Sequence, residues 1–490
     1  MDICRRTFTL SMMGGMSFKA WGLAPRPNLF VWILIELLRP DFLETAWSKL
    51  SNGGFRRLLT SGAYFPDCRH LASTFPATAL ATLATGAWPA EHGIVADLWW
   101  DNRWRRTVKA SEEEMLATTV AGQIAAEAGT RVYVIAADAP QAGLVAAHPA
   151  ARLFWQDREG RFNTLGNAPD WLSPFNTERP IERLHGAGWL AAGAAAGSPP
   201  LRELTYDAAH PQLFNELYQA SPFAAAAQFD FLRELATNER LGQSGSFDFV
   251  CLVVSAPARL GFETGAFSPL MQQMTLQIDL QMESLLTQLR RTLGDKGFDL
   301  ALAGCHGAPP APRPSVRSRM AVAGESVAQA VESALRDRNL GHVQKYLYPF
   351  LYLDGGAARD LEPMRQAAAA AALEHPAVAG YYTAGGACSS HDEWGRRFRN
   401  SFHPRRCGDV MLSYRPEYVE DYGQGRGISY GSLYNYDAGV PLCLYGPRFR
   451  SGLFESPVEA VDVAPTLARA CGVPLPSSST GRVLAEALAE

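Results

Sequence analysis

Short, continuous apolar runs alternate along the chain with longer segments in which apolar residues recur at helical spacing. The apolar runs predict strands over residues 30–37, 131–137, 247–255, 298–304, 410–414 and 441–445. Runs without polar alternation are typical of strands buried on both faces of a largely parallel sheet. The pattern therefore predicts an α/β fold.

Helical spacing predicts a long helix over residues 270–293. Further helices are expected over residues 326–336 and 364–373, the last of which is rich in alanine, a strong helix former. Because these segments lie between the predicted strands, helices should cover the sheet on its faces.

Two stretches interrupt this alternation. Residues from about 150 to 230 are rich in Pro, Gly, Ala and aromatic side chains, and residues from about 307 to 405 begin with a dense proline run. We interpret both as insertions that cap the carboxyl ends of the strands, where α/β sheets place their binding sites.

Composition and charge exclude some partners. A chain of 490 residues with 47% hydrophobic composition can bury a large core, as one α/β domain or as two smaller ones. The formal net charge of -4 gives no footprint for nucleic acid. The sequence has no uncharged apolar run of about 18 residues, so we expect no transmembrane segment.

The first 27 residues resemble an export signal. Arg5 and Arg6 form a twin-arginine-like motif, a weakly apolar stretch follows, and a cleavage region lies near Ala24. We predict an exported, periplasmic protein with a folded domain over residues 28–490; the alternative is a cytoplasmic protein with a short N-terminal tail. The eight cysteines show no disulfide-framework spacing, so the sequence selects no bridge.

Several motifs fall in order along the chain. Residues 255–265 read Ser-Ala-Pro-Ala-Arg-Leu-Gly-Phe-Glu-Thr-Gly, residues 85–95 read Thr-Gly-Ala-Trp-Pro-Ala-Glu-His-Gly-Ile-Val, and residues 430–437 read Tyr-Gly-Ser-Leu-Tyr-Asn-Tyr-Asp. They resemble motifs of the alkaline phosphatase superfamily, in the branch of monomeric exported bacterial enzymes related to nucleotide pyrophosphatases/phosphodiesterases. The resemblance covers nearly all of residues 28–490. It implies a three-layer fold, with helices on both faces of a mostly parallel sheet and with cap insertions.

The resemblance also implies a Thr or Ser nucleophile activated by two zinc ions. The ligands of the first zinc would fall on Ala258, Phe262 and Tyr430. Alanine and phenylalanine have no lone pair for zinc, and a phenol is a rare ligand. We therefore expect this metal site to be absent.

The second zinc would meet Glu36, the nucleophile position, Cys305 and His306. Glu, Cys and His are all legitimate zinc ligands, so at most one zinc in a remodelled site is predicted. The alternative is a buried free cysteine beside a structural histidine, which is commonplace. We expect no cofactor.

The nucleophile position is ambiguous. The local pattern points to Thr74, whereas counting back from the next motif without gaps points to Pro76, with Thr78 nearby. In an alternative interpretation, Thr74 only caps a helix that begins near Pro76.

The groups that would hold phosphoryl oxygens are also replaced. Asp97 stands where the resemblance implies Asn, and Asp138 and Pro140 stand where it implies Lys and Arg. A carboxylate repels a phosphate dianion, and the cations that would stabilise transition-state charge are missing. His92 and Asp437 match retained positions in scaffold motifs, and we interpret His92 as a structural histidine.

Together these replacements lead to three hypotheses. The first is a catalytically degenerate pseudoenzyme with a binding or regulatory role, whose partner is an unknown small molecule or protein. The second is an active phosphoric ester hydrolase (a phosphatase or phosphodiesterase) with one rebuilt metal site and a Thr nucleophile. The third is recognition of a cationic or neutral ligand in a cleft lined by Glu36, Asp97, Asp138, Phe262 and Tyr430.

Overall fold

The computed structural model describes residues 26–489, except 196, 310–320, 323, 358, 417 and 421–429. Nearly all of the predicted export signal lies outside the described residues. Within them, no helix is long and apolar enough to cross a membrane. The cysteines in the described part are all free: Cys68, Cys251, Cys305, Cys388, Cys407, Cys443 and Cys471.

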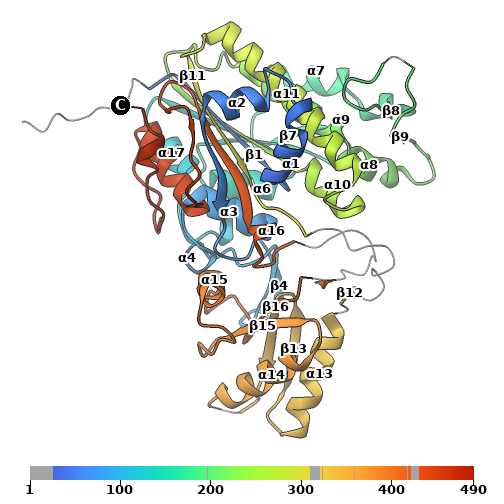
Figure 1. Ribbon diagram of the computed structural model, residues 1–490, viewed down its shortest axis with the longest axis vertical. Coiled ribbons are helices and arrows are strands. Elements are labelled where there is room, and N and C mark those ends of the chain that lie inside the picture. The colour runs from blue at the N-terminus through green and yellow to red at the C-terminus, as the bar shows by residue number, and fades with distance from the viewer. Residues whose placement is uncertain are drawn as a thin grey trace, which may run out of the picture.

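A ten-stranded sheet forms the body of the molecule (Figure 1). Its central strand, β1 (Leu29–Ile35), pairs in parallel with β10 (Phe247–Val254) on one side and β11 (Phe298–Gly304) on the other. Beyond β10, the strands β5 (Thr130–Ala136) and β6 (Arg152–Gln156) continue the parallel order. The predicted parallel core is confirmed.

The sheet edges are antiparallel. On the β11 side, β18 (Gly439–Tyr445) runs antiparallel to β11, and β2 (Ala63–Arg69) runs antiparallel to β18. The short strands β19 (Gly452–Leu453) and β20 (Val458–Glu459) pair with β2. At the opposite edge, β7 (Phe162–Thr164) runs antiparallel to β6.

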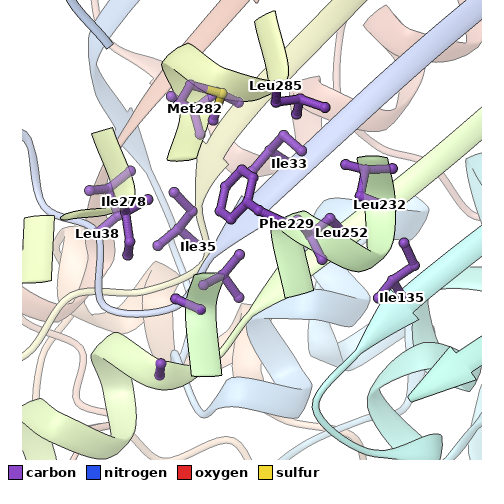
Figure 2. Packing of buried hydrophobic residues seen from close by; sticks show 14 of the residues in the cluster. Ile33, Ile35, Leu38, Ile135, Phe229, Leu232, Leu252, Ile278, Met282 and Leu285 are labelled. Carbon is purple, nitrogen blue, oxygen red and sulfur yellow. The ribbon is translucent and has the colours of Figure 1, made fainter. Parts of the chain in front are cut away.

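Helices cover both faces of this sheet, which confirms the three-layer architecture. Side chains of β1 alternate between two cores, with Ile33 packing on one side and Trp32 on the other. Figure 2 shows the first core, where Ile33 lies among Phe229, Met282 and Leu285. Its helices are α1 (Pro40–Ala46), α2 (Phe55–Ser61), α9 (Pro222–Asn238), α10 (Ala256–Thr264) and α11 (Pro269–Leu293). The second core lies under α3 (Pro76–Thr85), α5 (Val120–Ala126), α6 (Ala139–Ala146) and α17 (Val463–Cys471).

A second lobe lies beyond one end of the sheet (Figure 1). Its antiparallel strands are, in spatial order, β13 (His342–Leu347), β14 (Phe350–Asp354), β16 (Val410–Tyr414) and β15 (Val378–Thr383). Two helices, α13 (Gly324–Asp337) and α14 (Glu362–Glu374), share its core. The prediction that residues 410–414 join the parallel sheet was wrong. A fully buried strand reads as the same apolar run in either kind of sheet.

The two predicted insertions divide differently in space. Residues 150–230 include β6 and β7 of the central sheet as well as a hairpin of β8 (Ala187–Trp189) and β9 (Arg202–Leu204). Most of residues 324–414 form the second lobe.

The remaining elements are α4 (Pro89–His92), β3 (Leu98–Asp101), β4 (Arg106–Lys109), α7 (Leu172–Glu178), α8 (Pro211–Gln219), β12 (Ala321–Val322), α15 (Glu393–Ser401), β17 (Val419–Glu420) and α16 (Asn435–Ala438).

Candidate functional site

A cavity of about 700 Å³ opens at the carboxyl ends of β1, β5 and β10. This is the edge of a parallel sheet at which α/β proteins place their sites. All of the altered positions assigned to the first metal or to phosphate binding line it, together with Glu36: Glu36, Asp97, Asp138, Pro140, Ala258, Phe262 and Tyr430. The sequence therefore located one real cavity, although these positions are spread over the chain.

Local structure explains how α10 contributes two of these side chains. Ser255 is the N-cap of α10, and Pro257 occupies its first turn. Ala258 and Phe262 lie four residues apart, so they share one helix face. That face lines the cavity. Neither side chain brings a metal ligand to it.

Glu36 follows β1 and is only 3% exposed. Its Oε1 accepts a hydrogen bond from Gln141 Nε2 at 3.0 Å, and Gln141 Oε1 in turn accepts one from Ser255 Oγ at 3.1 Å. Burial raises the pKa of Glu36 to about 7, and the charge of Arg259 opposes that rise only in part. Near neutral pH this carboxyl group is therefore partly protonated.

Asp97 lies at the start of α3. Its Oδ1 accepts a hydrogen bond from the backbone N–H of Ala77 at 2.9 Å, and burial raises its pKa to about 6. The N-cap of α3 is Phe75, whose side chain makes no cap bond, so the interpretation of Thr74 as a helix cap was wrong. Pro76 does occupy the first turn, as predicted. Asp97 supplies from elsewhere in the chain the oxygen that the cap residue lacks.

Asp138 and Pro140 begin helix α6. Asp138 is its N-cap and accepts a hydrogen bond from the backbone N–H of Gln141 at 2.9 Å, and Pro140 lies in the first turn. An N-cap aspartate with a proline just after it is an ordinary way to start a helix. These two positions thus stabilise local structure and offer no cation to the cavity.

The proposed nucleophiles lie elsewhere. Thr74 and Thr78 are fully buried, and neither lines the cavity. Thr74 Oγ1 donates a hydrogen bond to the carbonyl oxygen of Ser432 at 3.2 Å. Thr78 Oγ1 has no hydrogen-bond partner. A buried hydroxyl without an adjacent base or metal is a weak nucleophile.

Cys305 and His306 are also fully buried and do not line the cavity. The Cys305 thiol lies in the core under α3, and burial raises its pKa well above the usual value, so it stays protonated. His306 Nδ1 lies 2.8 Å from the carbonyl oxygen of Gly307. In the described part of the chain, no group of three or more His, Cys, Asp or Glu side chains is placed to hold a metal. The structure therefore does not assemble Glu36, Cys305 and His306 into the predicted single-metal site.

Arg39 follows β1 closely but does not bind Glu36, Cys305 or His306. Its guanidinium pairs with Asp41 and donates to the carbonyl oxygens of Ala308 and Tyr436. It thereby ties the segment after β1 to the segments around β11 and α16.

Two further histidines differ in how their ring nitrogens are satisfied. His92 Nε2 lies 3.1 Å from Thr82 Oγ1, and its Nδ1 accepts from the backbone N–H of Ile94, so its interpretation as a structural histidine is confirmed. His70, which sequence analysis missed, is fully buried; its ring lies beside the backbone of Cys305, but neither ring nitrogen makes a well-aligned hydrogen bond to a described residue. Burial lowers the pKa of both histidines to about 3. No local motif marks His70.

Sequence analysis also missed the charged residues of the cavity wall that the family resemblance does not assign to metal or phosphate binding. Lys109 and Arg259 line the cavity, as do Glu216 and Glu263. Arg259 donates to the side chain of Gln219, and Glu263 pairs with Arg202 at 2.6 Å. Arg259 and Glu263 lie within the motif of residues 255–265, whereas Lys109 and Glu216 lie in segments whose sequences give no signal of a shared site.

Fold and cavity together define an α/β protein with its candidate site at the carboxyl edge of a mostly parallel sheet. Residues 30–425 match the family model of type I phosphodiesterase / nucleotide pyrophosphatase, and the chain belongs to this family.

Curated relatives match along nearly their whole length. Alkaline phosphatase PhoV of Synechococcus elongatus is 23% identical, with 94% of this chain and 93% of the relative covered. Alkaline phosphatase PafA of Elizabethkingia meningoseptica is 21% identical, with 97% of each chain covered. A protein of Myroides odoratus named calcium-transporting ATPase is 22% identical, covering 94% of this chain and 95% of the relative.

Solved structures agree on the fold. Wild-type PafA superposes with a TM-score of 0.81 at 19% identity, covering 95% of this chain and 100% of the other. A murine ectonucleotide pyrophosphatase / phosphodiesterase 5, solved with AMP, gives a TM-score of 0.58 at 15% identity with the same coverage. The alkaline-phosphatase-like fold is therefore shown.

Proposed function

We propose that this protein is a catalytically degenerate member of its family and that its cleft serves a binding or regulatory role. The observation that carries the proposal is a separation in space. The cavity offers carboxylates, amides, apolar side chains and the two cations Lys109 and Arg259, whereas the candidate nucleophiles Thr74 and Thr78 are buried outside its lining.

Phosphoryl transfer needs a nucleophile within reach and positive charge around the transferred group. Glu36, Asp97 and Asp138 bring carboxyl groups to the cavity instead. When ionised they repel a phosphate dianion. The cavity therefore disfavours the charge that a phosphatase must stabilise.

The two-zinc centre implied by the family resemblance does not fit the residues present. The columns of the first zinc hold Ala258, Phe262 and Tyr430, which include no imidazole, thiolate or carboxylate. The columns of the second hold Cys305 and His306, which the described structure does not bring together with Glu36 as a ligand group.

Sequence spacing supports the assignment of residues in this chain to the nucleophile and phosphate-binding positions of the family. PafA has been solved with a Thr, an Asn, a Lys and an Arg substituted together. In that chain the Thr and Asn are as far apart as Pro76 and Asp97 are here, and the Lys and Arg are separated by one residue, as Asp138 and Pro140 are. This spacing favours Pro76, which has no hydroxyl, over Thr74 as the residue at the nucleophile position.

The alternative is an active phosphoric ester hydrolase with one rebuilt zinc site, and the alkaline phosphatases among the relatives are the reason to test it. The decisive assay measures turnover of an aryl phosphate together with zinc per chain by elemental analysis. We expect no turnover above that of the Thr74→Ala variant and far less than one zinc per chain. Turnover that disappears in Thr74→Ala, or about one zinc that disappears in Cys305→Ala, would establish the alternative.

Export remains a proposal as well, supported by the twin-arginine-like motif at Arg5 and Arg6. We expect the mature protein in the periplasm, with its N-terminus near residue 28. N-terminal sequencing of the fractionated protein checks this, and an intact Met1 in the cytoplasm would support the alternative location.

A further inference from the structure

We propose that the cavity binds an organic cation, an ammonium group carried on an alkyl or aryl skeleton. This inference rests on the proposed function, because it assigns a ligand class to the same cleft. The carboxylates and the apolar part of the cavity wall support it, and the described residues offer no arrangement for binding a metal ion instead.

Carboxylate oxygens without partners face this cavity from several elements. Glu36 is only 3% exposed and lines the cavity. Its carboxylate interacts with the side chains of Gln141 and Ser255. Asp97 and Asp138 each use only Oδ1. The Glu216 carboxylate accepts no hydrogen bond from any residue that the structure describes, and it too lines the cavity. An ammonium group is the natural donor for such acceptors because it carries several N–H bonds and a positive charge.

The remaining wall suits the carbon skeleton of such a ligand. Leu144, Leu213 and Leu217 line the cavity together with Phe262 and Tyr430. Aromatic rings attract cations as well as apolar groups. The volume of about 700 Å³ also lies within the range of small-molecule sites.

A bare metal ion fits this arrangement less well. A metal needs its ligands to converge on one point, and no group of three or more His, Cys, Asp or Glu side chains does so among the described residues. Carboxylates distributed around a large cavity suit a longer molecule instead. A diamine can meet two of them at once.

An anion would find fewer partners. Lys109 and Arg259 are the basic side chains that line the described cavity, and Arg259 already donates to Gln219. Glu263 is paired with Arg202 and is not counted among the free carboxylates. The remaining imbalance favours a cation.

Cation binding should also release protons. Glu36 faces Asp97, Asp138 and Arg259, with the phenol of Tyr430 and the thiol of Cys305 nearby, and its pKa is about 7. Asp97 faces Asp138, Lys109 and Tyr430, and its pKa is about 6. A bound cation favours the ionised form of each group and lowers its pKa. Affinity for the cation should therefore rise as the pH increases from 5 to 8.

Calorimetric titration of the full chain tests the proposal with benzylamine and 1,4-diaminobutane. Benzyl alcohol and 1,4-butanediol are the neutral controls, and inorganic phosphate is the anionic one. We expect the amines to bind at pH 8 roughly tenfold more tightly than the alcohols because of their charge, a difference of about 1.4 kcal/mol in binding free energy. Affinity should fall at pH 5, and the binding heat should depend on the ionisation enthalpy of the buffer.

Variants locate the binding site. Glu36→Gln and Asp97→Asn should each weaken amine binding several-fold and reduce the proton release, whereas Glu455→Gln, an exposed residue outside the cavity lining, should change neither. If a carboxylate variant does not fold, Phe262→Ala provides a second test, with loss of benzylamine affinity expected.

Three outcomes would overturn the inference: equal binding of amines and alcohols, binding of phosphate in preference to amines, or no amine binding up to millimolar concentration. The aryl phosphate assay separates this failure from failure of the proposed function. A chain that neither hydrolyses phosphate esters nor binds amines would contradict only the ligand class, whereas hydrolysis would contradict the proposed function.

Discussion

The two sides of Tyr430 differ in what can reach them. On one side lies the cavity, with Glu36 and Asp97 in its wall. On the other, the ring of His306 lies 5.0 Å from the ring of Tyr430, centroid to centroid, and is fully buried. The cavity wall carries carboxylates together with Lys109 and Arg259, whereas Thr74, Cys305 and His306 are buried outside it. Catalysis needs both in one place, so the scaffold alone does not make this protein a phosphatase.

The buried side is also poorly satisfied. His70 and His306 have ring nitrogens without partners, as do Thr78 Oγ1 and Asp437 Oδ1. Each unpartnered buried polar atom destabilises a fold by roughly 1–3 kcal/mol. The cavity side, by contrast, uses Asp97 and Asp138 to start helices. Asp97 and Asp138 therefore stabilise the starts of two helices, whereas several buried polar atoms on the other side leave hydrogen bonds unmade among the described residues.

The largest effect is expected from restoring metal ligands to the cavity side of Tyr430. The triple variant Ala258→Asp, Phe262→His, Tyr430→His returns a carboxylate and two imidazoles to the cavity wall. We expect zinc affinity to rise at least about a hundredfold, because three added ligands create a site where there was none. Titration against a competing chelator measures it.

The matched control for that experiment is Ala258→Asn, Phe262→Gln, Tyr430→Gln, which has similar size and polarity but weaker ligands. Equal zinc affinity in the two triple variants would show that the three side chains do not converge on one metal ion. The assignment of these positions to the first zinc would then be wrong.

Glu36 should limit stability at alkaline pH. Its folded pKa of about 7 exceeds the unfolded value of 4.5, so the native state binds more protons between these values, and stability is lost as the pH rises through 7. Glu36→Gln should remove up to about 3 kcal/mol of this loss. Thermal unfolding at pH 5 and pH 8 checks it: the variant should gain at pH 8 and change little at pH 5. A gain of the same size at both values would mean that the carboxyl group does not titrate.

His70 and His92 provide a matched pair on the buried side. His70→Leu should stabilise the protein by roughly 1–2 kcal/mol because it removes two buried nitrogens that lack a well-aligned hydrogen bond, whereas His92→Leu should destabilise it by a similar amount because it breaks two hydrogen bonds. Denaturant unfolding at pH 7 distinguishes them, and equal losses would contradict the contrast.

His70 and His92 should also make the stability of the protein depend on pH. Burial holds the folded pKa of each histidine at about 3, below the unfolded value of 6.5. The unfolded chain therefore binds more protons, and stability falls as the pH drops below 6.5. In each Leu variant, the free energy of unfolding should decrease less steeply as the pH is lowered below 6.5.

Thr74 should give the smallest effect. Thr74→Val removes the hydrogen bond to Ser432 and should destabilise the protein by about 1 kcal/mol. Turnover of aryl phosphate and binding of amines should remain at wild-type levels. A selective loss of turnover, with Thr74→Ser retaining it, would instead identify this hydroxyl as a nucleophile.

Much of the fold could be predicted from apolar runs. The central strands were placed to within about two residues, and the predicted helix over residues 270–293 is α11, Pro269–Leu293. Residues 410–414 were correctly predicted as a strand but assigned to the wrong sheet, because an apolar run records burial and not the identity of its neighbours.

The candidate site was predicted only in part. Motif positions located Glu36, Asp97 and Tyr430, all of which line the cavity. The role of Gln141, which bonds Glu36, and the burial of His70 could not be predicted, since neither belongs to a motif and each depends on contacts between distant segments.

The sequence by itself determined the scaffold and which ligand types are missing, because strand periodicity and the loss of imidazole and carboxylate at Ala258 and Phe262 are local properties. Only the tertiary structure decided which remaining groups share the cavity and which are sealed from it. Glu36 and Cys305 follow neighbouring strands, yet one lines the cavity and the other packs in the core. Because Ile35 pairs with Gly304, the two residues that follow them stand side by side at the ends of their strands, and strand periodicity cannot separate them. The segments packed around each side chain decide its access to the cavity, and protonation follows from access.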